Sequence, residues 1–198
     1  MTNLFTGQVA IVTGGGSGIG EALCLELARR GARVVVADIN ADNARRVAAA
    51  IGSQATASTV NVAIEPDVTR LVEDTAAAHG RLDYMFNNAG FAIGGDARDL
   101  TLDHWRRVLD VDLYGVLYGM HAAYPIMARQ GFGHIVNTSS AAAFSPLLVT
   151  PRTARPSTPW WGCPCRCAWR VSIWGSRSAV SVPGSCAPTS TGTRKRST

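Results

Sequence analysis

The chain has 198 residues, of which 46% are hydrophobic and 17% charged, as is typical of one folded domain with a proper core. It has no basic, apolar leader at residues 1–5 and no apolar run that could cross a bilayer, so we expect a cytoplasmic protein without membrane contact. The net charge of +5 does not indicate a nucleic-acid-binding domain, because residues 1–150 carry 11 basic and 14 acidic side chains and only the last 48 residues are strongly basic, at +8.

Short β-branched runs alternate with helical segments from residue 9 to residue 138, which is typical of a parallel sheet covered by helices on both faces. We predict strands at residues 9–12, 33–37, 56–60, 82–86 and 134–137. Helices are predicted at residues 18–30, 41–51, 66–79, 102–118 and 119–129, with glycines as stops. The fold class is therefore α/β, a doubly wound parallel sheet in three layers.

A glycine-rich turn, T-G-G-G-S-G-I-G at residues 13–20, joins the first predicted strand to the first helix. Such a turn presents free backbone N–H groups and the positive end of a helix to a pyrophosphate. Gly14 makes the turn, Gly18 lets a phosphate approach the backbone, and Gly20 lets the helix pack closely on the strand. The candidate cofactor contacts of the turn are Thr13, Gly14, Gly16, Ser17, Gly18, Ile19 and Gly20. Glycines also serve ordinary tight turns, so the motif needs support elsewhere in the chain.

Asp38 ends the second predicted strand, at the distance from the glycines where a ribose-binding acid is expected. Its carboxylate can accept hydrogen bonds from both hydroxyls of an adenosine ribose and would repel a 2′-phosphate, which favours NAD over NADP. No Arg or Lys stands inside the turn, and Ile39 directly follows Asp38. The alternative is that Asp38 caps the helix that begins at Ala41.

Two more strand ends carry residues that fit the same ligand. Asn61 and Val62 follow the third strand, where a polar side chain could reach the adenine amino group. Asn88, Ala89 and Gly90 follow the fourth strand, where small residues leave room for the cofactor and asparagine amides bridge neighbouring strands.

Five motifs in order resemble the short-chain dehydrogenase/reductase family, over about residues 7–146. They are T-G-x-x-x-G-x-G at 13–20, Asp38, N-N-A-G at 87–90, W-x-x-V-x-x-V-x-L-x-G at 105–115 and I-V-N-x-S-S at 135–140. The resemblance implies a Rossmann-like sheet with NAD as cofactor. It also implies a homo-oligomeric enzyme that moves a hydride and a proton between a small-molecule alcohol and its carbonyl.

The resemblance assigns two catalytic positions. Ser140 matches the family serine that hydrogen-bonds the substrate oxygen, although a turn serine bonded to local backbone is the alternative. Asp112 stands where the family has a helix asparagine that helps hold a proton-relay water, so we expect it to have only a supporting role.

The family's Tyr-x-x-x-Lys pair is missing. Thr153 and Ser157 stand at the expected positions, the one lysine is Lys195, and the last tyrosine is Tyr124. In the family the tyrosine exchanges the proton, while the lysine lowers its pKa and binds the nicotinamide ribose. We therefore expect little or no activity, and a non-catalytic NAD-binding remnant is the alternative function.

The composition changes where this pair should stand. Residues 151–198 hold four of the five Cys, four of the five Trp and six of the nine Pro, but no Leu, Phe, Tyr or acid. We therefore interpret residues 1–150 as a NAD-binding domain and residues 151–198 as a disordered tail, read out of frame after loss of one nucleotide between the codons of Ser140 and Arg152.

Reading the tail back in the other frame tests this hypothesis. A tyrosine codon then spans Arg152 and Thr153 and is followed by x-A-T-K, in the register of the family motif. At Trp161 and Gly162 the rebuilt codons allow no choice of base, and they encode Val and Gly. Residues 182–190 permit P-G-F-V-R-T-D-I, which is like the family's loop over the nicotinamide.

Other interpretations of the tail are weaker. The run C-P-C-R-C at residues 163–167 is too closely spaced for zinc, so we expect no metal site. Arginines and tryptophans together can bind nucleic acid, but a basic by-product of GC-rich codons also explains the lack of Leu and acids. With the tail out of frame we expect a five-stranded sheet with residues 134–137 at its edge, an open apolar patch and a disrupted oligomer interface.

Overall fold

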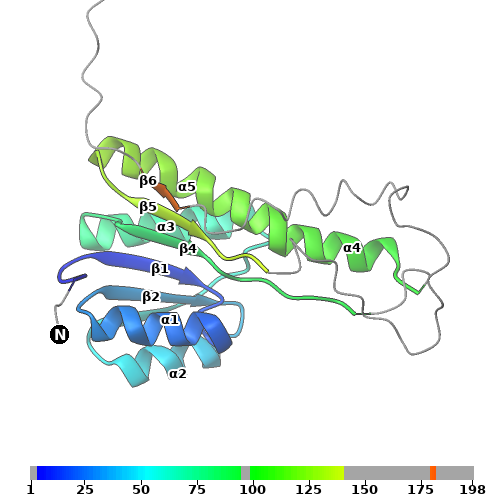
Figure 1. Cartoon of the computed structure of the whole chain (residues 1–198), viewed down its shortest axis with the longest axis horizontal. Helices are drawn as coiled ribbons and strands as arrows, with labels where there is room; N and C mark the ends of the chain where they lie inside the picture. Colours follow the sequence, from blue (N-terminus) through cyan, green and yellow to red (C-terminus); the bar gives the residue numbers. More distant parts are fainter. Residues whose placement is uncertain (1–3, 95–98, 141–178, 182–198) are drawn as a thin grey trace, which may run out of the picture.

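The computed structural model describes residues 4–94, 99–140 and 179–181 (Figure 1). The strands are β1 (Val9–Thr13), β2 (Arg33–Asp38), β3 (Ala55–Thr59), β4 (Tyr84–Asn87), β5 (His134–Asn137) and β6 (Ala179–Ser181). The helical segments are α1 (Gly18–Arg29), α2 (Ala41–Ile51), α3 (Glu65–His79), α4 (Leu102–Leu109), the π-helical turn η1 (Asp110–Tyr114) and α5 (Gly115–Gln130). None of the helices in these ranges combines the length and apolarity that a bilayer crossing requires.

The strands form one sheet in the order β3-β2-β1-β4-β5-β6, in which β1 to β5 are parallel. The chain moves outward from β1 to β3 and then returns to β4 on the other side of β1. This reversal between β1 and β4 is the topological switch point, beside which open α/β sheets bind ligands. The predicted doubly wound fold class is confirmed.

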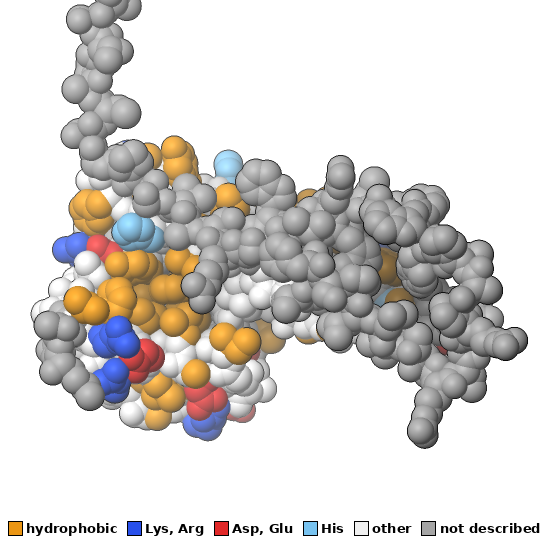
Figure 2. Space-filling model, viewed as in Figure 1, with side chains coloured by type: hydrophobic (Ala, Val, Ile, Leu, Met, Phe, Trp, Pro, Cys, Tyr) orange, Lys and Arg blue, Asp and Glu red, His pale blue; other side chains and the backbone are white. Residues whose placement is uncertain are grey.

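Side chains of β1 divide the core into its two faces. Ile11 packs with residues of α3 and α5, while Ala10 and Val12 pack with those of α1 and α2. Because both faces are covered, all five residues of β1 are buried, and the first four, residues 9–12, form a continuous apolar run. Figure 2 shows charged side chains of both signs over the α1 and α2 side, where ion pairs such as Glu26–Arg29 lie.

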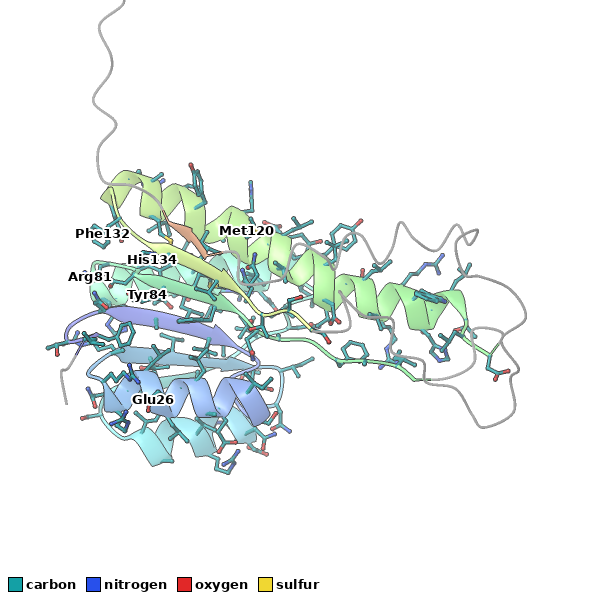
Figure 3. The ribbon with its side chains drawn as sticks, viewed as in Figure 1. Glu26, Arg81, Tyr84, Met120, Phe132 and His134 are labelled. Carbon is teal, nitrogen blue, oxygen red and sulfur yellow. The ribbon has the colours of Figure 1, made fainter. Side chains whose placement is uncertain are left out.

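Aromatic side chains occupy the amino ends of the strands. Tyr84 stacks on His134 with 5.2 Å between ring centroids, and the Arg81 guanidinium lies 5.1 Å from the ring centroid of Phe132 (Figure 3). Arg81 also pairs with the buried Asp83, whose Oδ2 accepts a hydrogen bond from the Val9 N–H at 2.8 Å. These contacts pack the side chains at the amino ends of β4 and β5 against one another.

The start of α2 decides whether Asp38 caps this helix. The N-cap of this helix is Asn40, whose Oδ1 accepts hydrogen bonds from the N–H groups of Asp42 at 3.1 Å and Asn43 at 3.0 Å. The capping role is therefore taken, and the interpretation of Asp38 as the helix cap is wrong.

The predicted break between residues 118 and 119 is also wrong. The helix runs on from α4 through η1 and α5, and Gly119 lies inside it. A Cβ atom at Gly119 would overlap Oδ1 of Asn87, so this glycine allows the helix to lie close to β4. The irregularity in the helix lies instead at Asp110–Tyr114.

The prediction of five strands with β5 at the edge is wrong as well. β6 pairs antiparallel with β5, in the register Ile135 opposite Val180. Thus Ala179–Ser181, in the segment predicted to be disordered, form a strand. The other predictions for this segment, including Thr153, Ser157 and the cysteine run at residues 163–167, lie outside the described residues.

Candidate dinucleotide-binding site

The carboxyl ends of the parallel strands bring four polar residues to one edge of the sheet, of which Thr13 and Asp38 are predicted site residues. Thr13 ends β1, Asp38 ends β2, and Asn87 and Asn137 end β4 and β5 in direct register. The amide of Asn87 donates to Oδ1 of Asn137 at 2.8 Å. We call residues 13–20, Asp38 and residues 87–90 together the carboxyl-edge cradle.

Each of three glycines in the turn is required or tolerated for a different geometric reason. Gly14 has φ +64°, and a Cβ atom on it would lie 2.9 Å from Cα of Ala89. Gly18 has φ +54° and open space around it. A Cβ atom on Gly20 would overlap the carbonyl of Gly14, so only glycine lets α1 begin this close to the turn. The turn thus contacts the residue 87–90 loop on one side and stays open at Gly18.

The amino end of α1 is available to an anion. Its N-cap, Ser17, has an extended backbone with φ −156° and makes no side-chain capping hydrogen bond. The first N–H groups of a helix have no partner within the helix, so they can donate to a ligand. The next residue but one, Ile19, is 72% exposed and lies beside these groups.

Thr13 ties the turn to the neighbouring loop. Its hydroxyl donates to the carbonyl oxygen of Phe86 at 3.2 Å and accepts from the N–H groups of Asn88 at 3.0 Å and Ala89 at 3.1 Å. The Asn88 amide in turn donates to the Thr13 carbonyl at 3.1 Å. Two segments far apart in sequence are thereby held as one surface, as the predicted bridging asparagines require.

Asp38 is bound to the turn by its own carboxylate. Oδ2 accepts the Gly16 N–H and Oδ1 accepts the Asn40 N–H, both at 2.9 Å. The side chain is half-buried, and the neighbouring Ile39 is 69% exposed. Each carboxylate oxygen has further acceptor capacity, so the group can still receive hydroxyl donors.

Arg46 is a residue of this region that sequence reasoning missed. Its guanidinium donates to the Gly16 carbonyl at 2.9 Å and to both carboxylate oxygens of Glu21, at 2.7 and 2.8 Å. The hydrogen bond from Arg46 lowers the pKa of Glu21, which is therefore ionised at neutral pH. Arg46 lies 30 positions from Gly16, and no local pattern links the two.

Asn61 and Val62 follow the end of β3, but their side chains are engaged within the protein. Oδ1 of Asn61 accepts the Ala63 N–H at 3.1 Å. Val62 is 9% exposed and packs against Gly115, whose added Cβ would lie 3.0 Å from a Val62 methyl group. Contact of these two residues with a cofactor stays a prediction.

Asp112 lies against the end of the cradle. It stands in η1, and its Oδ1 accepts the Phe91 N–H at 3.1 Å, next to Gly90. Burial raises the pKa of Asp112, and the hydrogen bond from Phe91 offsets part of that rise. The structure thus places Asp112 beside residue 90 of the cradle, and its role in catalysis stays a prediction.

Ser140 lies three residues beyond the end of β5, with its side chain exposed. The segment leading to it is fixed at the same edge, because the Thr138 hydroxyl donates to Oδ1 of Asn88 at 3.1 Å and the Thr138 N–H donates to the Asn87 carbonyl at 2.9 Å. The structure therefore brings Ser140 to the side of the sheet that carries the cradle. In the described ranges no three His, Cys, Asp or Glu side chains gather as metal ligands would.

The fold and this edge define a dinucleotide-binding α/β protein. The model of the short chain dehydrogenase family matches residues 8–152. Cyclohexanol dehydrogenase of Acinetobacter sp. (strain SE19) is 42% identical over 147 residues, which cover 72% of this chain and 58% of that enzyme. The putative oxidoreductase SadH of Mycobacterium tuberculosis is 37% identical over 139 residues, covering 69% of this chain and 50% of SadH.

Solved structures of dehydrogenases and reductases are similar to this chain as well. The 3-ketoacyl-(acyl-carrier-protein) reductase from Brucella melitensis, in complex with NADH, has a TM-score of 0.69 and 32% identity, over 71% of this chain and 60% of the reductase. NAD+-bound xylitol dehydrogenase has a TM-score of 0.69 and 31% identity, over 72% of this chain and 56% of the dehydrogenase. This chain belongs to the short-chain dehydrogenase/reductase family. It spans less than two thirds of the length of each of these relatives.

Proposed function

We propose that the chain binds NAD in the carboxyl-edge cradle and derives from an oxidoreductase that interconverts an alcohol and a ketone or aldehyde. The observation that carries the proposal is the joint geometry of the turn and Asp38, in which a carboxylate fixed to the Gly16 N–H stands beside the uncapped amino end of α1. The helix end fits a pyrophosphate, and the carboxylate fits ribose hydroxyls. Bound NAD supplies the hydride acceptor or donor.

NAD is the proposed form of the cofactor because the Asp38 carboxylate, at the end of β2, is the group proposed to bind the adenosine ribose. The two carboxylate oxygens can receive both ribose hydroxyls, whereas a 2′-phosphate would meet a like charge. Two of the similar solved structures are described as bound to NADH or NAD+, which supports this assignment.

Ser140 is the proposed group that donates a hydrogen bond to the substrate oxygen, and Asp112 is a supporting group. The proton donor is missing, since the sequence has no Tyr-x-x-x-Lys after Ser140. A positioned general acid contributes about 10²–10⁴-fold to rate, so the chain should have weak activity or none. The proposed substrate is a small-molecule alcohol or carbonyl, and the proposed compartment is the cytoplasm. The altered sequence after residue 150 is proposed to disrupt the family's homo-oligomer interface.

The missing pair is best explained by a change of reading frame. The family match ends at residue 152, inside the segment where the proposed nucleotide loss falls. Sequencing the gene across codons 140–152 tests this explanation. A single-base loss relative to a frame that encodes Tyr-x-x-x-Lys is expected, and an undisturbed frame without family similarity in the alternative reading would refute it.

An absorbance assay at the NADH band tests the proposed activity. Full-length protein is incubated with NAD+ and cyclohexanol, the substrate class named for one relative. We expect turnover close to the enzyme-free rate. Brisk turnover that persists in Ser140→Ala would contradict both the missing acid–base pair and the assignment of Ser140.

A non-catalytic NAD-binding protein is the second candidate. The hydrogen bond between the Gly16 N–H and Asp38 supports cofactor binding, while the sequence lacks the proton donor, and this combination favours binding without reaction. Saturable NADH binding together with no turnover for a panel of secondary alcohols would select this candidate.

A further inference from the structure

We propose that Glu21 determines cofactor specificity, by holding Arg46 in an ion pair that keeps the guanidinium from neutralising a 2′-phosphate. The inference rests on the proposed NAD-binding function. It adds a second barrier to NADP beside the Asp38 carboxylate, and it places that barrier on α1 and α2.

Arg46 and Glu21 form a bidentate ion pair. Arg46 makes two hydrogen bonds to the Glu21 carboxylate, at 2.7 and 2.8 Å, and a third to the Gly16 carbonyl at 2.9 Å. A guanidinium in this bidentate geometry is bound more strongly than by a single contact. Its donors are directed at Glu21 and the turn, so few remain for a ligand.

Gly16 connects this pair to the ribose-binding carboxylate. The Gly16 N–H donates to Asp38 at 2.9 Å, while the carbonyl of the same residue accepts from Arg46. A Cβ atom on Gly16 would lie 2.8 Å from both Oδ2 of Asp38 and Cβ of Asn43, so α2 is pressed against the turn at this point. Arg46 and Asp38, the proposed ribose-binding group, thus bond to the same residue, Gly16.

The charges of this group set its preference. Asp38 and Glu21 carry two negative charges against the single positive charge of Arg46, so the group repels a phosphate and tolerates hydroxyls. The other ion pairs on these helices are separate from this group, because Arg45 pairs with Asp42, while Arg29 and Arg30 share the Glu26 carboxylate at the opposite end of α1 from Glu21. With Glu21 neutral, the group would have no net charge, and Arg46 would be free to form its fork with a phosphate.

The test compares Glu21→Gln with Glu26→Gln in the full-length protein. Both substitutions remove one negative charge and a bidentate arginine partner from α1, but Glu26 pairs with Arg29 and Arg30 rather than with Arg46. Titration calorimetry with NADH and with NADPH gives the ratio of the two affinities. We expect Glu21→Gln to raise the NADPH:NADH affinity ratio about tenfold, and Glu26→Gln to leave it within about twofold, since separated surface charges are screened.

The double substitution Glu21→Gln, Arg46→Ala is expected to return the ratio to the wild-type value. An unchanged ratio in Glu21→Gln, while the wild type binds NADH, would overturn the inference and leave NAD binding intact. An equal rise in Glu26→Gln would overturn it too, because overall charge would then account for the effect. Absence of NADH binding in the wild type would overturn the proposed function and the inference together.

Discussion

Single residues of the turn tolerate little change, and Gly20 shows this most directly. An added Cβ there would overlap the backbone carbonyl of Gly14, a fixed group that cannot rotate away. The intrinsic helix preference of alanine over glycine, about 1 kcal/mol, would otherwise favour the substitution.

We expect Gly20→Ala to lower the free energy of unfolding by about 2 kcal/mol, the usual cost of overpacking, and to abolish NADH binding. Thermal unfolding followed by circular dichroism, with a parallel NADH titration, measures both effects. Gly94→Ala is the control because a Cβ there meets nothing within 4 Å. Equal behaviour of the two variants would show that the close approach at Gly20 is unimportant.

The raised pKa of Asp112 predicts a pH-dependent effect on stability. Burial raises this pKa, so the folded protein binds the proton more tightly than the unfolded chain does. The ionised carboxylate therefore opposes folding, and its contribution to stability falls as pH rises from the ordinary value to the raised one. Asp112→Asn keeps an oxygen for the Phe91 N–H and should raise the melting temperature at pH 7.

That rise should shrink as the pH is lowered toward about 4, where the aspartate of the unfolded chain also becomes protonated. Melting curves of the wild type and of Asp112→Asn, recorded from about pH 4 to about pH 7 in steps of about one pH unit, measure the trend. The control is Asp110→Asn, which removes a carboxylate from the same turn. An identical rise in the control would assign the effect to overall charge.

Much of the site was predictable residue by residue, because its groups stand in short motifs. The turn, Asp38 and residues 87–90 are each recognisable within a few positions, and the parallel sheet brings them together. Arg46 was not predictable, since its bond to Gly16 depends on how α2 packs on the turn. Val62 lies under Gly115 for the same kind of reason, a tertiary contact without a local signal.

At the scale of elements, α2 links the fold to the site through its first turn. Asn40 caps the helix with two hydrogen bonds and also donates its N–H to Asp38. The bounds of α2 follow the sequence closely, because a polar cap precedes it and Gly52 ends it with φ +87°.

We expect Asn40→Ala to lower the free energy of unfolding by about 1 kcal/mol, the usual value of an N-cap. Urea unfolding measures the change. Asn40→Asp keeps the acceptor oxygen and should retain nearly all of the stability. A loss in Asn40→Asp as large as in Asn40→Ala would contradict the capping role of the side chain.

Elements placed by long-range contacts differ from their predictions. The α4–α5 helix continues past Gly119 because that glycine faces Asn87 and not solvent. A sequence pattern cannot separate a glycine that ends a helix from one that admits a neighbour. β6 was missed because three residues carry no period of their own, and pairing with β5 alone defines them.

At the scale of the whole molecule, an assembled glycine-rich turn with Asp38 beside it is combined with a sequence that lacks the Tyr-x-x-x-Lys pair. The frame hypothesis predicts that one inserted nucleotide, placed between codons 140 and 152, restores Tyr-x-x-x-Lys. The restored protein should oxidise a secondary alcohol at least about 10²-fold faster than the present chain, because a general acid–base is regained. A restored frame that gives folded but equally inactive protein would contradict the hypothesis.

The most direct measurement of the central claim is a calorimetric titration of the full-length chain with NADH. We predict saturable binding at a single site, since the turn, the amino end of α1 and Asp38 are already assembled in the structure. Asp38→Ala should weaken that binding, because the ribose hydroxyls lose their acceptor. Absence of saturable binding by the folded wild-type protein would contradict the account.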